Sequence, residues 1–218
     1  ARRLRLNRLM RKVLILGGNR WLGARVAARC LAAGDEVTCL ARTETPLVPA
    51  GARLVLADRR RPGAYDSVLD DWDEVVELAW ATDVVDSALQ ALGDRAAHWT
   101  LVSTVSVYAR NDEPNADEAA AVVEPVDLDD YGQAKVAGER AAAERVGDRL
   151  LIVRPGLIAG PGDPSDRFGY WPGRLRRGGD VLVTQDGSLL RVIAAAQPVL
   201  KITACTDHHH GHAHDPAF

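Results

Sequence analysis

Tyr131 and Lys135 lie four residues apart in YGQAKVAGER, so a helix would place both side chains on one face. An ammonium group beside a phenol stabilises the phenolate and lowers the phenol's pKa from about 10 toward neutral pH. Such a tyrosine can exchange a proton with a substrate when a hydroxyl group and a carbonyl group are interconverted. We therefore predict Tyr131 as a catalytic acid/base, with Lys135 as its charged partner.

Hydroxyl side chains upstream could complete this site. In LVSTVSVYAR a buried strand is followed by Ser103, Thr104 and Ser106 at its carboxyl end. A hydroxyl group there can hydrogen-bond a substrate oxygen whose charge changes during the reaction. A Tyr-x-x-x-Lys spacing is common by chance, but a hydroxyl-bearing strand followed by such a helix is more specific.

The stretch KVLILGGNRWLGARV has the pattern of a dinucleotide-binding turn. Gly17 and Gly18 directly follow an apolar strand and would allow a tight turn close to a pyrophosphate. Gly23 would let the next helix pack on the sheet, and the start of that helix offers N–H groups and a positive dipole. The alternative is a purely structural turn between a strand and a helix. The predicted cofactor contacts here are Gly17, Gly18, Asn19, Arg20, Trp21, Leu22 and Gly23.

The end of the second predicted strand indicates which dinucleotide would bind. An NAD site usually has an acidic residue there, which binds the ribose 2′-hydroxyl, but this chain has Ala41 and then Arg42. Arg42 would pair with a 2′-phosphate, and Arg20 would project toward the same region. We therefore favour NADP over NAD, the alternative being that both arginines are solvated surface charges. Asp58, after the third strand, either binds the adenine amino group or caps the next helix.

Short apolar segments alternate with helix-like segments through most of the chain. This alternation predicts an α/β fold, a Rossmann-type doubly wound parallel sheet with helices on both faces. Ligands should lie beyond the carboxyl ends of its strands. The predicted strands are 13–16, 36–40, 53–56, 74–78, 98–103 and 150–153, and the predicted helices are 21–33, 62–69, 82–92 and 131–146.

Taken together, these motifs resemble the extended branch of the short-chain dehydrogenase/reductase superfamily, the NAD(P)-dependent epimerases and dehydratases. The resemblance rests on LGGNRWLG, VSTVSVYA, YGQAKVAGER and VRPGLIAGPGDPSDRF. It implies that Thr104 is the catalytic hydroxyl, Tyr131 the catalytic tyrosine, and Lys135 its lysine and a ligand of the nicotinamide ribose. Arg20 is a departure, because the family usually has glycine there. Leu78, Ala79 and Pro155 are the remaining predicted cofactor contacts.

The resemblance implies hydride transfer to or from a nicotinamide, with a hydroxyl or keto group of a small molecule, such as a nucleotide sugar, as the reacting group. The family's C-terminal substrate domain is largely missing from the sequence, so we expect a C-terminally truncated cofactor domain. A cofactor-binding sensor or interaction module without catalysis therefore stays open as an alternative. A homodimer paired through the helices at 82–92 and 131–146 also stays open.

Charge and composition limit the remaining classes. Six basic residues and no acid lie in residues 1–12, so the net charge of −3 becomes −9 for the rest. Such an acidic body disfavours nucleic-acid binding. No apolar run reaches the roughly 20 residues of a membrane-spanning helix, and three widely spaced cysteines fit the cytoplasm. We interpret residues 1–10 as a basic leader that is a non-native extension, residues 11–183 as the NAD(P)-binding Rossmann domain, and residues 184–218 as an atypical histidine-rich tail without a defined metal site.

Overall fold

The computed structural model describes residues 10–45, 47–110, 112, 117–165, 169–170, 173 and 176–177. The predicted leader lies outside these residues except for Met10, and the predicted histidine-rich tail lies outside them entirely. Among the residues described, no helix is both long and apolar enough to cross a membrane.

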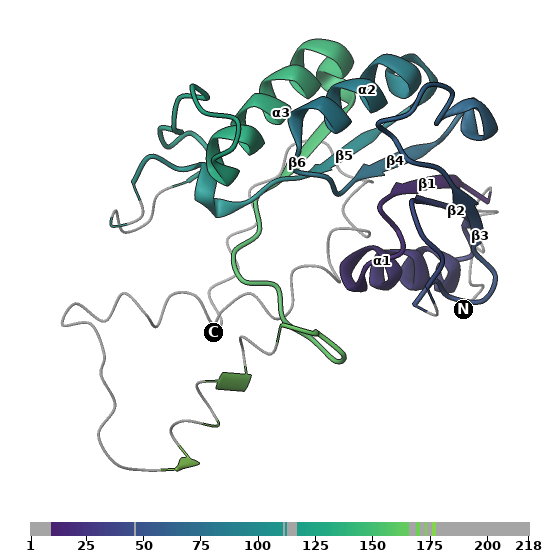
Figure 1. Cartoon of the computed structure of the whole chain (residues 1–218), viewed down its shortest axis with the longest axis horizontal. Coiled ribbons are helices and arrows are strands. Elements are labelled where there is room, and N and C mark those ends of the chain that lie inside the picture. The colour runs from purple at the N-terminus through teal and green to yellow at the C-terminus, as the bar shows by residue number, and fades with distance from the viewer. Residues whose placement is uncertain are drawn as a thin grey trace, which may run out of the picture.

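A six-stranded parallel sheet organises the described part of the chain, with the strand order β3-β2-β1-β4-β5-β6. Helix α1 covers one face of the sheet, and α2 and α3 lie side by side on the other (Figure 1). The predicted doubly wound α/β fold is therefore confirmed. The strands are β1 (Lys12–Leu16), β2 (Glu36–Ala41), β3 (Arg53–Leu56), β4 (Glu74–Glu77), β5 (Trp99–Val102) and β6 (Leu150–Val153), and the helices are α1 (Trp21–Ala32), α2 (Thr82–Leu92) and α3 (Tyr131–Val146).

The predicted helix at 62–69 is wrong. Only a single 3-10 turn, Asp66–Val68, forms there, after a run of hydrogen-bonded turns. Gly63 has φ +74, a left-handed conformation that does not continue a right-handed helix. A Cβ on Gly63 would also lie 2.9 Å from an Asp66 carboxylate oxygen. The apolar spacing in this segment serves to bury Tyr65 and Val68 in the core rather than to form a helical face.

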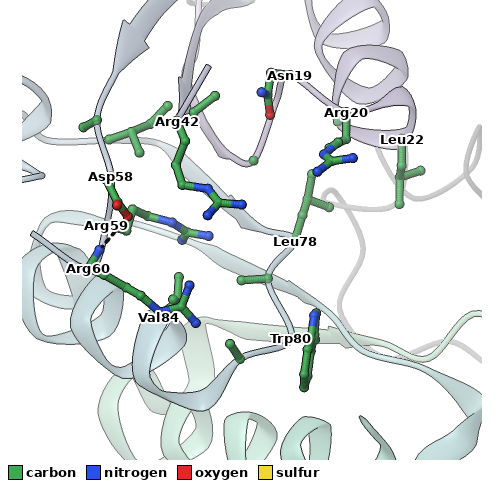
Figure 2. A pocket seen from close by; sticks show the side chains of 17 residues that line it. Asn19, Arg20, Leu22, Arg42, Asp58, Arg59, Arg60, Leu78, Trp80 and Val84 are labelled. Carbon is green, nitrogen blue, oxygen red and sulfur yellow. Dashed lines mark hydrogen bonds between the residues drawn. The ribbon is translucent and has the colours of Figure 1, made fainter. Parts of the chain in front are cut away.

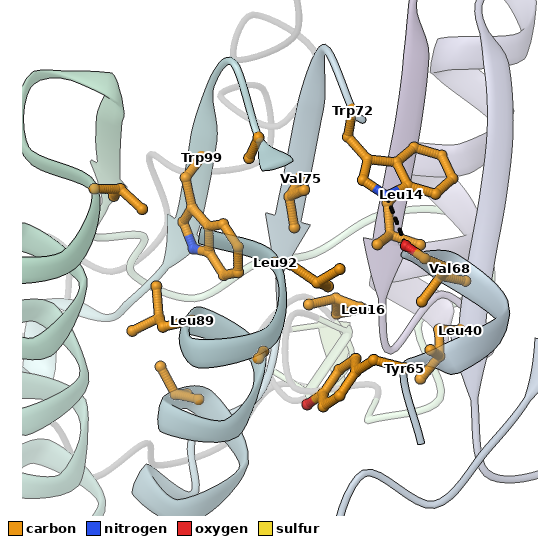
Figure 3. Close-up of a cluster of buried hydrophobic side chains, with 14 of the residues drawn as sticks. Leu14, Leu16, Leu40, Tyr65, Val68, Trp72, Val75, Leu89, Leu92 and Trp99 are labelled. Carbon is orange, nitrogen blue, oxygen red and sulfur yellow. Dashed lines mark hydrogen bonds between the residues drawn. The ribbon is translucent and has the colours of Figure 1, made fainter. Parts of the chain in front are cut away.

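The central strand β1 supplies apolar side chains to both faces of the sheet. Leu14 and Leu16 belong to the cluster on the α2 and α3 side, while Val13 and Ile15 belong to the cluster on the α1 side. Successive side chains of a strand point to opposite faces, so a strand covered on both sides must be apolar throughout. Figure 3 shows the cluster on the α2 and α3 side, in which Trp99 is fully buried.

The strand order places a crevice at the carboxyl edge of the sheet. After β1 the chain crosses to one face to form α1, and after β4 it crosses to the other face to form α2. Because β1 and β4 are neighbours, the two connections diverge between them. In doubly wound sheets, ligands bind where the connections diverge in this way.

Candidate active site

Two clefts adjoin at the carboxyl ends of the strands. The glycine-loop cleft, of about 440 Å³, is formed by the turn after β1, the ends of β2 and β3, and the loop from β4 to α2 (Figure 2). The tyrosine cleft, of about 560 Å³, is formed by the end of β5, the start of α3 and residues 155–158. Leu22 and Leu78 line both clefts, so the clefts meet at these two side chains.

Most of the predicted site residues line one of these clefts. Gly18 lines neither, because it packs beneath the turn against β2. The predicted residues in the glycine-loop cleft are Gly17, Asn19, Arg20, Leu22, Gly23, Arg42, Asp58, Leu78 and Ala79. Those in the tyrosine cleft are Trp21, Leu22, Leu78, Thr104, Tyr131, Lys135 and Pro155.

The glycines of the turn are required by close packing. Gly17 has φ +98, and its N–H donates to the Leu40 carbonyl oxygen at 2.9 Å. A Cβ on Gly18 would lie 2.5 Å from the Cys39 sulfur, and one on Gly23 would lie 2.6 Å from the Gly17 carbonyl oxygen. Larger residues would therefore force the turn away from β2 and α1 away from the turn. This geometry leaves the backbone of the turn open to a ligand.

The start of α1 suits a bound phosphate. Arg20 is the N-cap residue, in extended conformation, and no side chain caps the helix. The first N–H groups of a helix lack partners within it and carry the positive end of the helix dipole. Asn19 fixes the turn instead: its side-chain nitrogen donates to the Thr43 carbonyl oxygen at 2.9 Å, and Thr45 Oγ1 donates to the Asn19 carbonyl oxygen at 3.0 Å.

Four arginines line the glycine-loop cleft, with Arg20 across the cleft from the other three (Figure 2). The predicted Arg20 and Arg42 are exposed, and neither forms an ion pair with another residue that the structure describes. Arg59 and Arg60 also line the cleft and were not predicted. Their charges are paired, because Arg59 contacts Glu77 at 2.6 Å and Arg60 contacts an exposed aspartate on α2 at 2.8 Å. The uncompensated positive charge in this cleft therefore belongs to Arg20 and Arg42.

Asp58 does not cap a helix, because the chain between β3 and β4 forms only the 3-10 turn Asp66–Val68. Its carboxylate accepts the Arg60 N–H at 3.1 Å, and its carbonyl oxygen accepts the Arg61 N–H at 2.8 Å. These bonds close a turn that places Asp58 in the wall of the cleft. The alternative in which it helps to bind a ligand remains consistent with this position.

The structure brings Thr104 and Tyr131 into the same cleft, from β5 and α3 respectively. Thr104 Oγ1 accepts the Ser106 N–H at 3.2 Å, and Thr104 is buried while Tyr131 is 45% exposed. Asp130 caps α3 by accepting the Gln133 N–H at 2.9 Å, which fixes the helix start at Tyr131.

Gly132 allows α3 to pack closely against the turn after β5. A Cβ at that position would lie 2.6 Å from the Ser106 carbonyl oxygen, so any larger residue would push α3 away from the turn after β5.

Lys135 is buried one helical turn beyond Tyr131. Its ammonium group donates to the Ala79 carbonyl oxygen at 2.8 Å and to the Val102 carbonyl oxygen at 2.5 Å. Burial lowers the pKa of Lys135 to about 8, although the nearby carboxylates of Glu77 and Glu139 act in the opposite direction. An ammonium group has three donors, so two are used in fixing the site and one is left for a ligand.

Two arginine–glutamate pairs flank this lysine. Glu77 is fully buried and pairs with Arg59, while Glu139 is 5% exposed and pairs with Arg154 at 2.6 Å. Each arginine compensates a carboxylate that would otherwise be buried without an opposite charge. The site therefore alternates positive and negative charges from β3 through β4 and α3 to β6.

Ser103 lines the tyrosine cleft, but its hydroxyl is bonded to Glu139. Its hydroxyl donates to a carboxylate oxygen of Glu139 at 2.5 Å, and Ser103 is only 3% exposed. Arg154 holds the same carboxylate and lies over the Tyr108 ring at 5.0 Å. Of the three hydroxyls after β5, Thr104 and Ser106 are thus the two available to a substrate.

Trp21 and Pro155 belong to the wall of the tyrosine cleft. The indole N–H of Trp21 donates to the Pro161 carbonyl oxygen at 3.1 Å, and Arg25 donates to the same oxygen. The Pro155 carbonyl oxygen accepts the Val105 N–H at 3.0 Å. These bonds hold the segment after β6 over the start of α1, so Trp21 acts in packing at this position.

Sequence reasoning missed Trp80, Arg59 and Arg60, which line the glycine-loop cleft, and the buried Glu77, which pairs with Arg59. The ring of Trp80 lies 6.1 Å from that of Tyr131, centroid to centroid, at an interplanar angle of 60°. The run DRRR after β3 was a usable signal for Arg59. Glu77 gave no signal, because a single acid in an apolar strand reveals its partner only in three dimensions. Within the described ranges, no group of three or more His, Cys, Asp or Glu side chains is placed to hold a metal ion.

A doubly wound sheet with a glycine turn after β1 and a Thr–Tyr–Lys cluster beyond β5 defines the extended short-chain dehydrogenase/reductase class. The sequence profile of the NAD dependent epimerase/dehydratase family matches residues 13–194. The chain belongs to this family.

Individual relatives agree with this assignment. The chain is 29% identical over 180 residues to dTDP-6-deoxy-L-talose 4-dehydrogenase (NAD(P)(+)) from Kitasatospora kifunensis, covering 71% of this chain and 54% of that protein. A putative epimerase from Burkholderia cenocepacia J2315 superimposes with a TM-score of 0.61 at 27% identity, over 76% of this chain and 59% of that one. The Bordetella bronchiseptica enzyme WbmG, solved in complex with NAD, shares the fold with a TM-score of 0.63 at 21% identity, over 82% and 64%. The chain thus spans less than two thirds of the length of these relatives.

A second similarity is short. Over 36 residues, or 16% of the chain, the sequence is 69% identical to the urease accessory protein UreE of Polaromonas naphthalenivorans (strain CJ2), of which it covers 17%. A match of that length does not extend to the fold or the family of the chain as a whole.

Proposed function

We propose that this chain carries the cofactor site and the catalytic residues of an NADP-preferring oxidoreductase of the epimerase, dehydratase or dehydrogenase type. Its substrate is a small molecule with a hydroxyl or keto group, and a nucleotide sugar such as a dTDP-sugar is the first candidate. The observation that carries the proposal is the meeting of Thr104, Tyr131 and Lys135 in a cleft that adjoins the glycine turn.

The glycine-loop cleft fits a dinucleotide on its own geometry. Gly18 and Gly23 let the turn pack on β2, and α1 pack on the turn, more closely than any side chain would allow. The start of α1 supplies N–H groups for a pyrophosphate. Arg20 and Arg42 supply the positive charge that a 2′-phosphate needs and that a 2′-hydroxyl does not. This charge is the basis for preferring NADP.

The chemistry follows from the donors in the tyrosine cleft. A bound nicotinamide would exchange a hydride with the substrate carbon. Tyr131 would give or take the proton at the substrate oxygen, and Thr104 would hydrogen-bond that oxygen while its charge changes. Lys135 would keep the Tyr131 phenol acidic and use its third N–H on the ribose of the cofactor.

Turnover of a substrate panel by the Tyr131→Phe variant tests this mechanism. The panel would contain dTDP- and UDP-sugars, ketones and secondary alcohols, assayed with NADP(H) and NAD(H). We expect Tyr131→Phe to lose at least roughly a hundredfold in kcat, because general acid–base catalysis contributes that much. Tyr65→Phe is the matched control, because it removes the same hydroxyl from a tyrosine that bonds Ser87 away from the tyrosine cleft. Full activity of Tyr131→Phe would refute the mechanism.

The second candidate function is an NADP-binding sensor or interaction module without catalysis. Its support is the glycine-loop cleft, in which Arg20 and Arg42 would bind the 2′-phosphate whether or not a substrate reacts. The same panel distinguishes the two functions, since NADPH binding without turnover of any substrate supports the second.

We also propose that the protein works in the cytoplasm, binds neither nucleic acid nor membrane, and pairs as a homodimer through α2 and α3. Cys30 and Cys39 are buried free cysteines, as expected of a protein in the reducing cytoplasm. Helices α2 and α3 pack together on one face of the sheet, which gives them a shared outer surface for a second copy. Light scattering after size-exclusion chromatography would measure the mass of the assembly.

A further inference from the structure

Trp80 lines the glycine-loop cleft, and its ring contacts Tyr131 of the tyrosine cleft. It follows β4, lines the glycine-loop cleft and is 47% exposed, while its ring meets the edge of Tyr131 at 6.1 Å. Figure 2 shows it below Leu78, on the side of the cleft away from Arg42 and Asp58.

The backbone on both sides of Trp80 is fixed. The Ala79 N–H donates to the Glu77 carboxylate at 2.7 Å, and the Ala79 carbonyl oxygen accepts from Lys135 at 2.8 Å. On the other side, the Ala81 carbonyl oxygen accepts the Val84 N–H at 3.1 Å in the first turn of α2. The indole is therefore presented by an anchored loop.

A half-exposed indole in this position is well suited to being covered by a ligand. Tryptophan carries one of the largest apolar surfaces of any side chain, and edge-to-face pairs of aromatic rings are favourable beyond the area that they bury. The contact with Tyr131 uses part of the ring and leaves the part that faces the cleft open to solvent. A planar ring or a ribose laid against that part would remove the remaining apolar surface from water.

The position of Trp80 along the cleft indicates which half of a dinucleotide would cover its ring. Arg42 and Asp58, the proposed ligands of the adenosine half, lie on the side of the cleft away from Trp80. The other half must reach Tyr131 and Lys135 to react, and the route from one cleft to the other passes Leu78 and Trp80. The nicotinamide riboside is thus the half that Trp80 would meet.

We propose that Trp80 is a positioning residue that packs against the nicotinamide-riboside half of the cofactor and, through its edge contact, holds the Tyr131 ring in place. Binding of the cofactor and placement of the tyrosine are then coupled through one indole. The inference rests on the proposed function, because it takes the dinucleotide site and the role of Tyr131 from there.

Calorimetric titration of the full chain with two ligands tests the contact with the cofactor. NADPH reaches Trp80, whereas adenosine 2′,5′-bisphosphate carries only the adenosine half. We expect Trp80→Ala to bind NADPH roughly tenfold more weakly, as for loss of one stacked ring, and to bind the bisphosphate as the wild type does. Arg42→Ala is the matched control and should weaken both ligands.

A wild-type affinity of Trp80→Ala for NADPH, or an equal loss for both ligands, would overturn the contact. Trp80→Phe keeps an aromatic ring on the same loop and should show a smaller loss in the same direction if Trp80→Ala does not fold. A wild-type chain that binds neither ligand would instead refute the dinucleotide site of the proposed function.

A double-mutant cycle on NADPH affinity tests the link to Tyr131. If Trp80 positions the tyrosine, Tyr131→Ala should cost at least roughly threefold less in the Trp80→Ala background than in the wild type, because one partner of the pair is already gone. A purely structural role of Trp80 would leave the two losses additive. Additive losses would therefore overturn the positioning role.

Discussion

Replacing Lys135 by methionine should change how the stability of the fold depends on pH. Burial lowers the pKa of Lys135 to about 8, against an ordinary value of 10.5 in the unfolded chain. Between these two values the unfolded state binds a proton that the folded state has released. The free energy of unfolding of the wild type should therefore rise with pH across this window, relative to Lys135→Met.

The size of the effect follows from the shift. One pKa unit corresponds to about 1.4 kcal/mol, so a shift from 10.5 to about 8 predicts a total relative gain of about 3 kcal/mol, most of it between about pH 7 and pH 10. The whole cost of burying the charge is present below about pH 8, where both states are protonated.

Urea denaturation of both proteins over this pH range would measure the gain. The buried thiols of Cys30 and Cys39 titrate at higher pH, with pKa values of about 11, and contribute equally to both proteins, so they cancel in the difference. Parallel stability curves for the wild type and Lys135→Met would refute the conclusion that Lys135 is a buried ammonium group. A difference that falls with rising pH would refute it as well.

Three further outcomes follow from contacts around the site. Gly18→Ala should destabilise the fold by about 1–3 kcal/mol in thermal unfolding, because the new Cβ would overlap the Cys39 sulfur. Gly156→Ala should have no such effect, because no heavy atom lies within 4 Å of its Cβ position, and equal effects of the two variants would contradict the packing argument. Ser103→Ala should lower the free energy of unfolding by about 1–3 kcal/mol in urea denaturation, because Glu139 loses a buried hydrogen-bond donor. Ser106→Ala, on the open cleft, should not, and an unchanged stability of Ser103→Ala would show that the bond to Glu139 is dispensable. Hydrogen bonding to Glu74 raises the pKa of His98 in the folded state. The stability that His98 adds over His98→Gln should therefore be full below about pH 6.5 and be lost as the pH rises through the folded-state pKa of His98. A pH-independent difference between the two proteins would contradict the His98–Glu74 pair.

Much of the fold could be predicted because its signals are local. The segments at 53–56, 82–92, 131–146 and 150–153 were predicted with the bounds that the structure shows. Their apolar runs and helical spacing need no knowledge of distant contacts. The segment at 62–69 has a helical spacing too, but Gly63 takes a left-handed conformation there and the turns of the segment follow it.

The site residues also divide into those in local sequence patterns and those whose partners lie on distant elements. The glycine turn and the Tyr–Lys spacing are local patterns, so they could be predicted. The pairs Arg59–Glu77 and Arg154–Glu139 join different elements, and their partners become visible only when the sheet places them side by side. Ser103 follows β5 just as Thr104 and Ser106 do, so the sequence does not distinguish the three hydroxyls. Only the fold shows that the Ser103 hydroxyl is bonded to Glu139.

The most direct test of the central claim is a fluorescence titration of the 218-residue chain with NADPH and with NADH. The account predicts saturable binding of both, with NADPH bound at least roughly tenfold more tightly, because one charge-assisted pair with the 2′-phosphate contributes that much. Arg42→Ala should remove this preference, and Arg140→Ala, whose arginine pairs with Glu124 away from both clefts, should keep it. Tighter binding of NADH would contradict the role of Arg20 and Arg42, and binding of neither nucleotide would contradict the dinucleotide site itself.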